Sequence, residues 1–109
     1  MINVTVLTDN NQITEFELSG HAESGPYGYD LVCAGVSAVT FGAVNAVIAL
    51  CNIDLDIEQG EEGGYLRVQF PHSLNEEIME KTQTLLEGMI VSLETIEREY
   101  SQFVKIHRK

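Results

Sequence analysis

The sequence predicts a single α+β domain, spanning residues 1–109, with the element order β-β-α-β-β-α and a short last strand as a further candidate. Three observations support this fold class. Two pairs of segments alternate apolar and polar residues across short turns. A long uncharged run lies between the two pairs, and an amphipathic segment follows the second pair. We therefore expect two hairpins that form a mainly antiparallel sheet, packed with one buried helix and one amphipathic helix.

The first hairpin is predicted from residues 2–8, INVTVLT, and residues 13–20, ITEFELSG, which both alternate. The TDNNQ stretch between them has the Asp and Asn content of a turn. In the second strand, Phe16 and Leu18 share one face, whereas Glu15 and Glu17 share the other. The hairpin should therefore have one buried face and one polar face.

The first helix is predicted from an uncharged run between Leu31 and Ile53. The run is long enough to span a membrane. However, it is rich in glycine and alanine and contains Ser37, Thr40, Asn45 and Asn52, and no Lys or Arg flanks it to set an orientation. We therefore expect a buried helix of a soluble domain over residues 31–51, and no membrane partner.

The second half is predicted to form another hairpin and another helix. Residues 53–58, IDLDIE, and 65–70, YLRVQF, alternate on either side of a glycine-rich acidic turn, so Ile53, Leu55 and Ile57 should face inward. Ser73 and Glu76 have capping-box spacing, and apolar residues then recur every three, four or seven positions as far as Tyr100. Residues 103–107, FVKIH, could form a last strand.

The composition limits the partners and the location of the protein. Seventeen acidic and six basic residues give a formal charge of −11, which disfavours nucleic acid and favours a basic protein partner. Cys33 and Cys51 would lie about 27 Å apart along one helix, too far for a disulfide. Unbridged thiols and the lack of a recognisable secretory signal predict a cytoplasmic protein.

Cys33 and His21 are the first candidates for chemistry. If Asp30 caps the helix, Cys33 lies in its first turn, where unpaired N–H groups and the helix dipole favour a thiolate. His21 follows Gly20 at the end of the second strand, and an imidazole near the thiol could exchange its proton. The residues alone also fit a small core thiol and a surface histidine, because a spacing of twelve is no general signature.

Two more residues share a helix face with the cysteine. Asp30, Cys33 and Ser37 stand at positions i, i+3 and i+7. Asp30 could orient the imidazole of His21 or only cap the helix. Ser37 could donate a hydrogen bond within the site or to the carbonyl of Cys33. If Cys33 attacks a peptide, the N–H groups of the first turn, such as those of Cys33 or Ala34, would stabilise the oxyanion.

The loop between the candidates contains Gly25, Tyr27 and Gly28. Its glycines provide the backbone freedom to close over a bound peptide, although the loop could equally be a plain connection. His72 and His107 lie far from this stretch in the sequence, and no spacing matches a structural zinc site. We expect no metal and no cofactor.

The whole stretch from Gly20 to Ser37, with GHA, a glycine-bearing loop and DLVCAGVS, closely resembles the motif of the bacterial ribosomal-processing cysteine proteases (Prp). The length and the element order agree with that family over essentially the whole chain. The resemblance implies that Cys33 is the nucleophile and His21 the general base, with Asp30 and Ser37 in support. It also implies a loop that moves on peptide binding, a homodimer, and removal of a short N-terminal extension from a large-subunit ribosomal protein precursor.

Two other functions remain open from the residues. The domain could be a non-catalytic adaptor that binds a basic ribosomal protein through its acidic faces, with an inert Cys33. It could also be a thiol redox sensor, although Cys51 is too distant along one helix to act as the resolving thiol. The rate of Cys33 alkylation as a function of pH separates an activated thiol from an inert one.

Overall fold

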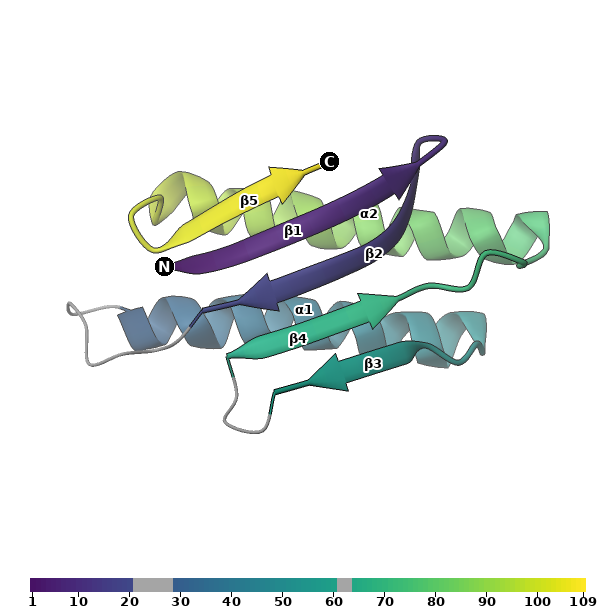
Figure 1. The fold of residues 1–109 in the computed structure, drawn as a ribbon, viewed down its shortest axis with the longest axis horizontal. Helices are drawn as coiled ribbons and strands as arrows, with labels where there is room; N and C mark the ends of the chain where they lie inside the picture. Colours follow the sequence, from purple (N-terminus) through teal and green to yellow (C-terminus); the bar gives the residue numbers. More distant parts are fainter. Residues whose placement is uncertain (21–28, 61–63) are drawn as a thin grey trace.

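The chain forms a five-stranded sheet with both helices packed on the same face (Figure 1). The computed structural model describes residues 1–20, 29–60 and 64–109, apart from the side chains of residues 29 and 30. The elements are β1 (Ile2–Asp9), β2 (Gln12–Ser19), α1 (Tyr29–Cys51), β3 (Asp56–Gln59), β4 (Tyr65–Gln69), α2 (Glu76–Glu99) and β5 (Val104–Arg108). The predicted α+β class and element order are confirmed, including the last strand.

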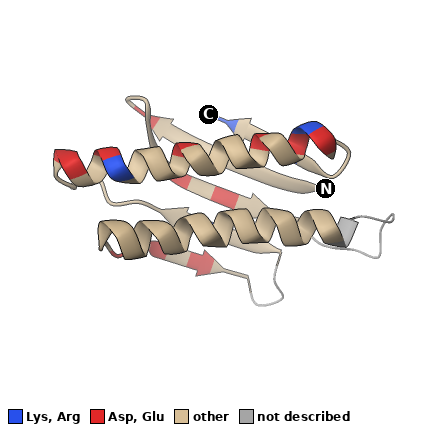
Figure 2. Ribbon diagram, turned by 180° about the vertical axis from the view of Figure 1, so that it is seen from behind, with Lys and Arg blue, Asp and Glu red and all other residues tan. Residues whose placement is uncertain are grey.

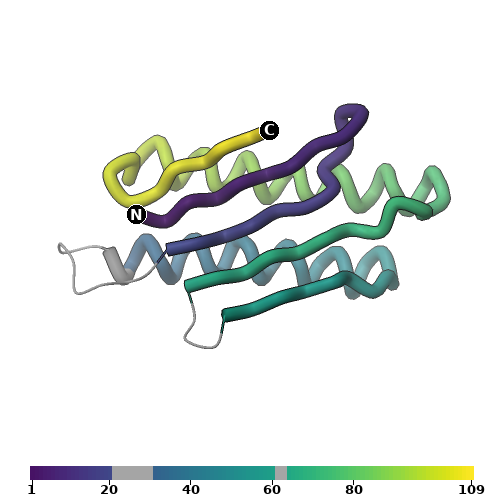
Figure 3. Tube along the Cα trace, viewed as in Figure 1, coloured from purple at the N-terminus to yellow at the C-terminus, as the bar shows by residue number. Residues whose placement is uncertain are grey.

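The strand order in the sheet is β3-β4-β2-β1-β5. Neighbouring strands are antiparallel except β1 and β5, which are parallel, with Ile2 opposite Val104. Figure 3 shows the C-terminal strand at the outer edge of the sheet beside β1, so the first and last strands of the chain lie side by side. The mainly antiparallel sheet is therefore as predicted.

The turn between β1 and β2 consists of two asparagines, Asn10 and Asn11, with φ angles of 52° and 64°. Positive φ at both central residues is the signature of a type I′ turn, which matches the twist of a hairpin. The register shifts between Leu7 and Thr8, which indicates a bulge. As a result Ile13 and Phe16, three positions apart, are both buried in the core.

The helix α1 is buried on one face only. Six of its described side chains, spaced three or four residues apart, pack into the core: Val32, Val36, Thr40, Val44, Val47 and Cys51. The buried Thr40 hydroxyl donates to the Val36 carbonyl at 2.9 Å, so this polar group is satisfied within the helix. On the opposite face Leu31 is 68% exposed and Phe41 38% exposed.

The predicted burial of the first helix therefore holds for one of its faces in this single chain. Apolar residues surround the helix, but the sheet and α2 cover only one side of it. Among the described residues, Leu31–Cys51 is the one helix that is long and apolar enough to cross a membrane by length and composition. A core helix of a soluble protein passes the same test.

The helix α2 begins after Asn75, whose side-chain oxygen accepts a hydrogen bond from the N–H of Ile78 at 2.8 Å. The prediction that Ser73 caps this helix is therefore wrong. With Asn75 as the cap, half-buried Leu74 and Met79 occupy the two positions of a hydrophobic staple, which explains the later start. Figure 2 shows α2 and α1 side by side, with acidic residues along α2 and no charged residue on α1 from Leu31 to Cys51.

The strand β3 is shorter than predicted and lies at the edge of the sheet. Asn52, with a φ of 56°, follows the last residue of α1, and the chain then reaches the edge only at Asp56. Ile53 and Leu55 pack against the core before the strand begins. Ile57 is opposite the buried Val68 but remains 41% exposed, because β3 is the edge strand and no described strand lies beyond it.

Candidate active site

The predicted site lies where β2 ends and α1 begins, at the same end of the molecule (Figures 1 and 3). Of the predicted residues, His21, Gly25, Tyr27 and Gly28 lie outside the described residues, and their placement stays a prediction. Cys33, Ser37 and the backbone of Asp30 belong to α1.

Cys33 is the fifth residue of α1, is half-buried, and packs against the hydrophobic core. Because the helix begins at Tyr29, the prediction that Cys33 lies in the first turn is wrong. The field of the helix dipole falls off within the first turn, so its effect on Cys33 is weaker than expected. The neighbouring Val32 and the next-turn Val36 are buried, which fixes the helix at this point against the core.

The same offset changes the expected oxyanion donors. An α-helix leaves only its first four N–H groups without intrahelical acceptors. Since α1 begins at Tyr29, the N–H groups of Cys33 and Ala34 fall after this set. They have acceptors one turn earlier in the helix, and the expectation that they stabilise an oxyanion is wrong.

Asp30 is the second residue of α1 and therefore is not the N-cap, contrary to one of the two predicted roles. A carboxylate in the first turn still interacts favourably with the helix dipole. The helical backbone places Asp30, Cys33 and Ser37 on one face, as the spacing predicted, and Ser37 is half-buried like the cysteine. The supporting roles of Asp30 and Ser37 stay predictions.

The two cysteines of the chain differ in accessibility. Cys51 is the last residue of α1 and is 5% exposed, whereas Cys33 is half-buried near the other end. One helix carries both thiols, about 27 Å apart, so no disulfide joins them, as predicted. Of the two thiols, that of Cys33 is the more accessible.

Sequence reasoning did not assign a role to Gly20, the last described residue before His21. Its N–H donates to the carbonyl of Gly64 at 2.9 Å, which ties the end of β2 to the start of β4. The local signal was a glycine placed directly between a strand and a candidate catalytic histidine.

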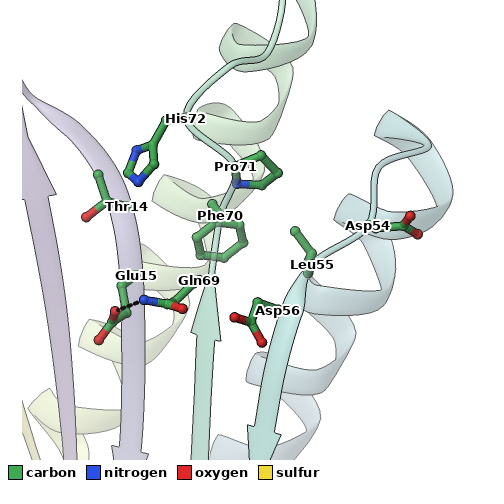
Figure 4. Close-up of a pocket in the computed structure, with 9 residues that line it drawn as sticks. All are labelled: Thr14, Glu15, Asp54, Leu55, Asp56, Gln69, Phe70, Pro71 and His72. Atoms are coloured by element: carbon green, nitrogen blue, oxygen red, sulfur yellow. Dashed lines mark hydrogen bonds between the residues drawn. The ribbon is translucent and has the colours of Figure 1, made fainter.

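A cavity of about 620 Å³ lies beside Asp54, just after the C-terminal end of α1 (Figure 4). Its carboxylates come from Glu15, Asp54 and Asp56. The Glu15 carboxylate accepts hydrogen bonds from the Arg67 guanidinium, at 3.1 Å, and from the Gln69 amide, at 2.9 Å. The Arg67 hydrogen bond holds the pKa of Glu15 below its ordinary value. No cysteine lines the cavity, and the Glu15 carboxylate is already hydrogen-bonded within the protein.

The described ranges contain no group of three or more His, Cys, Asp and Glu side chains arranged to hold a metal ion. His107 is exposed on the open face of the sheet, where its Nε2 lies 3.3 Å from the side-chain oxygen of Asn3. His72 borders the cavity of Figure 4. His72 therefore lies beside the segment after the end of α1, and His107 lies on the sheet beside β1, whereas Cys33 is near the start of α1.

Comparison with known proteins identifies relatives over nearly the whole chain. The family model described as cysteine protease Prp matches residues 1–105. The ribosomal processing cysteine protease Prp of Bacillus subtilis is 50% identical over 107 residues, which cover 97% of this chain and 96% of that protein.

Two crystal structures of the essential ribosomal processing protease Prp from Staphylococcus aureus have the same fold, with full coverage of both chains. The complex with a substrate peptide has a TM-score of 0.86 at 37% identity. The complex with a covalently linked product peptide has a TM-score of 0.85 at 39% identity. The chain therefore belongs to the family of the cysteine protease Prp.

Proposed function

We propose that this cysteine protease removes a short N-terminal extension from a large-subunit ribosomal protein precursor, with Cys33 as nucleophile and His21 as general base and acid. One observation carries the assignment of the nucleophile. Of the two cysteines, Cys51 is buried at the far end of α1, and Cys33 is the accessible one, at the end where β2 leads into His21. The substrate class is supported by the relatives, which are named ribosomal processing proteases.

The proposed reaction has two steps. The Cys33 thiolate attacks the scissile carbonyl, and the C–N bond breaks as the His21 imidazolium gives its proton to the leaving amine. The extension is then held as a thioester on Cys33. A water molecule then gives a proton to His21 while its oxygen attacks the thioester, and the C–S bond breaks. The extension leaves as a carboxylic acid that loses its proton to the solvent, and the thiolate–imidazolium pair is regenerated. The first-turn N–H groups of α1 are available to stabilise the oxyanion.

The remaining predicted residues support these steps. Asp30 orients the imidazole of His21, and Ser37 adds a hydrogen bond on the Cys33 face of α1. The loop with Gly25, Tyr27 and Gly28 covers the bound peptide and excludes water from the thioester until the amine has left.

The charge of the protein suits the proposed substrate. The net charge of −11 attracts a basic ribosomal protein and repels nucleic acid. Much of this charge lies along α2 and on the strands, away from the uncharged part of α1 that begins at Leu31 (Figure 2). Two unbridged thiols fit a reducing compartment, so we place the protein in the cytoplasm, where ribosomal precursors are made.

The test of this function uses the purified protein and a precursor that carries the extension. Mass spectrometry should show one cleavage, and Cys33→Ala should abolish it without loss of fold. His21→Ala should lower kcat/KM by about 10²–10⁴-fold, the usual contribution of a general acid–base. Cys51→Ala is the matched control and should retain cleavage. Cleavage by Cys33→Ala would show that the nucleophile is wrong.

A second measurement separates the protease from the adaptor. The rate of Cys33 alkylation should reach half its maximum well below pH 8.5, the ordinary pKa of a free thiol. His21→Ala should move this midpoint upward. A midpoint near 8.5 in the unmodified protein would indicate an inert thiol and support the adaptor.

We also infer that the protein forms a homodimer through α1. A stripe of exposed residues runs along the helix with spacings that alternate between three and four: Leu31, Ala34, Ala38, Phe41, Asn45 and Ile48. This is the spacing of a helix-pairing seam, and its alanines permit close approach of a second helix. The stripe has no charge, so a second copy can pack on it without bringing two acidic surfaces together.

Sedimentation at several protein concentrations tests the dimer. Phe41→Glu places a carboxylate in the centre of the stripe, and should convert the dimer to a monomer. Val91→Glu is the matched control, because Val91 is 62% exposed on α2, outside the stripe. A Phe41→Glu variant that remains dimeric would exclude α1 as the interface, and a wild-type monomer at all concentrations would exclude the dimer.

A further inference from the structure

We infer that Gly20 is a positioning residue that fixes where, and in which direction, the segment beginning with His21 leaves the sheet. The inference rests on the proposed catalytic role of His21. Three restraints on Gly20 support it. The first is its own φ angle, the second is contact with the start of β1, and the third is a hydrogen bond to the residue before β4.

The first restraint is the backbone conformation of Gly20. Its φ angle is 133°, a value that residues with a side chain rarely adopt. The chain therefore turns out of β2 in a direction that only glycine reaches without strain. The direction of that turn determines where the next residue begins.

The second restraint is the start of β1, which leaves no room for a side chain at residue 20. A Cβ atom built on Gly20 would lie 2.3 Å from the carbonyl oxygen of Met1 and 2.9 Å from the Cα of Ile2. These are backbone atoms that cannot rotate away. Ile2 is also held in place, since its side chain is buried and its N–H donates to the carbonyl of Phe103 at 2.8 Å.

The third restraint is the start of β4. The N–H of Gly20 donates to the carbonyl of Gly64 at 2.9 Å, and Gly64 has a φ of 75°, again a conformation that favours glycine. The end of β2 is thus held on one side by β1 and on the other by β4. Two glycines with positive φ make this junction.

These restraints matter for catalysis because the partner thiol is fixed as well. Cys33 lies on α1 between the buried Val32 and Val36, so the helix cannot shift to follow a displaced histidine. An imidazole and a thiol must be within hydrogen-bond reach to exchange a proton. A misplacement of about 1 Å is enough to lower a rate by about 10²-fold.

The test is Gly20→Ala in the full-length protein, assayed on the extended precursor. We expect kcat to fall by about 10²-fold, with a much smaller change in KM, because the peptide still binds while the dyad is misaligned. The pH midpoint of Cys33 alkylation should rise towards 8.5, as it should in His21→Ala. A loss of stability alone would not move this midpoint in protein that remains folded.

Two controls isolate the effect. Gly88→Ala makes the same chemical change in α2, where a Cβ atom meets nothing within 4 Å, and should leave kcat and the alkylation midpoint unchanged. Ile90→Val truncates a buried side chain of α2 and serves as a destabilised variant with an intact junction. If Gly20→Ala does not fold, Gly64→Ala strains the same junction more mildly, and should shift the alkylation midpoint in the same direction.

Folded Gly20→Ala, or Gly64→Ala in its place, with wild-type kcat and alkylation midpoint would overturn the positioning role. The proposed function would still stand in that case if His21→Ala and Cys33→Ala are inactive. Conversely, an active His21→Ala variant would remove the catalytic role of His21, whatever the result at Gly20. The two failures are therefore distinguishable.

Discussion

The side chain of Gln83 connects α2 to the first hairpin. It hydrogen-bonds the backbone N–H and carbonyl of Ile13, which have no partners in a neighbouring described strand on this side of β2. The strand β4 ends at Gln69, opposite Glu15, so no strand lies beside Ile13 on that side of β2. The side-chain amide of Gln83 takes the place of the missing strand. Its oxygen accepts from the Ile13 N–H at 2.7 Å, and its nitrogen donates to the Ile13 carbonyl at 2.9 Å.

We predict that Gln83→Ala lowers the free energy of unfolding by about 2–4 kcal/mol. The substitution leaves two backbone groups of Ile13 unpaired, and Ile13 is 1% exposed. Each unsatisfied buried group costs about 1–3 kcal/mol, and the partly buried surroundings allow some hydration, which limits the total. Since a domain of this size has about 5–15 kcal/mol of stability, the loss is large. At about 4–8 °C per kcal/mol, the melting temperature should fall by more than about 8 °C.

Urea denaturation followed by circular dichroism measures this loss, with an unchanged m-value as evidence that the native state is otherwise intact. Gln83→Glu sharpens the test, because an ionised carboxylate can accept from the Ile13 N–H but cannot donate to its carbonyl. That variant should be destabilised at neutral pH and should recover part of the loss when the carboxyl is protonated and can donate.

The control for this prediction is Thr84→Ala, at the next and exposed position, where the hydroxyl donates only to the Glu80 carbonyl of its own helix. It should change stability by less than about 0.5 kcal/mol. If Gln83→Ala is equally neutral, water replaces the amide without cost, and the argument that the amide substitutes for a strand is wrong.

Two further predictions concern stability. The Arg67 hydrogen bond lowers the pKa of Glu15, so the stabilisation from this carboxylate is full above the ordinary value of 4.5 and is lost as the pH falls below it. Urea titrations below pH 5 should therefore show a steeper loss of stability in the wild type than in Arg67→Met, and equal slopes would refute this. Gly88→Ala should raise stability by about 0.5–1 kcal/mol in the same assay, because this exposed helical site has space for a Cβ atom; a decrease would contradict it.

The order of elements could be predicted from the sequence because β1, β2 and β4 each have one buried and one open face. Phe16 and Val68 alternate with polar neighbours and lie opposite one another in the sheet. The two asparagines at positions 10 and 11 predicted the turn, and their positive φ angles explain why these residue types occur there. Local pattern and tertiary structure agree in these segments.

The burial of α1 could not be predicted in the same way, because apolar residues surround this helix and no face stands out. The buried and exposed faces of α1 nevertheless differ in residue type. The inner positions are mostly valine, as at Val36 and Val44, whereas the outer stripe has alanine at Ala34 and Ala38. The burial of Thr40 depends on a hydrogen bond to its own helix, which the sequence does not reveal.

The errors at the helix starts have a common physical cause. Ser73 and Asn75 both suit an N-cap, and the capping-box spacing favoured the serine. The contacts that decide between them are apolar, since only the start after Asn75 places Leu74 and Met79 at the staple positions. At α1 the apolar run begins at Leu31, which predicts a start there, although the helix begins at Tyr29. The charged Asp30 interrupts the apolar pattern, so the pattern does not indicate that the helix extends back to Tyr29.

The requirement for glycine at position 20 lies beyond any local pattern, because it arises from segments that are remote in the sequence. Residue 20 contacts the backbone of Met1 and Ile2 and is hydrogen-bonded to Gly64, so the need for a missing side chain appears only when β1, β2 and β4 are assembled. The glycine of the GHA motif is therefore required by the packing of the sheet, in addition to the proposed catalytic role of the histidine that follows it. If the dyad depends on that junction, substitutions at the starts of β1 and β4 should change catalysis without touching the peptide.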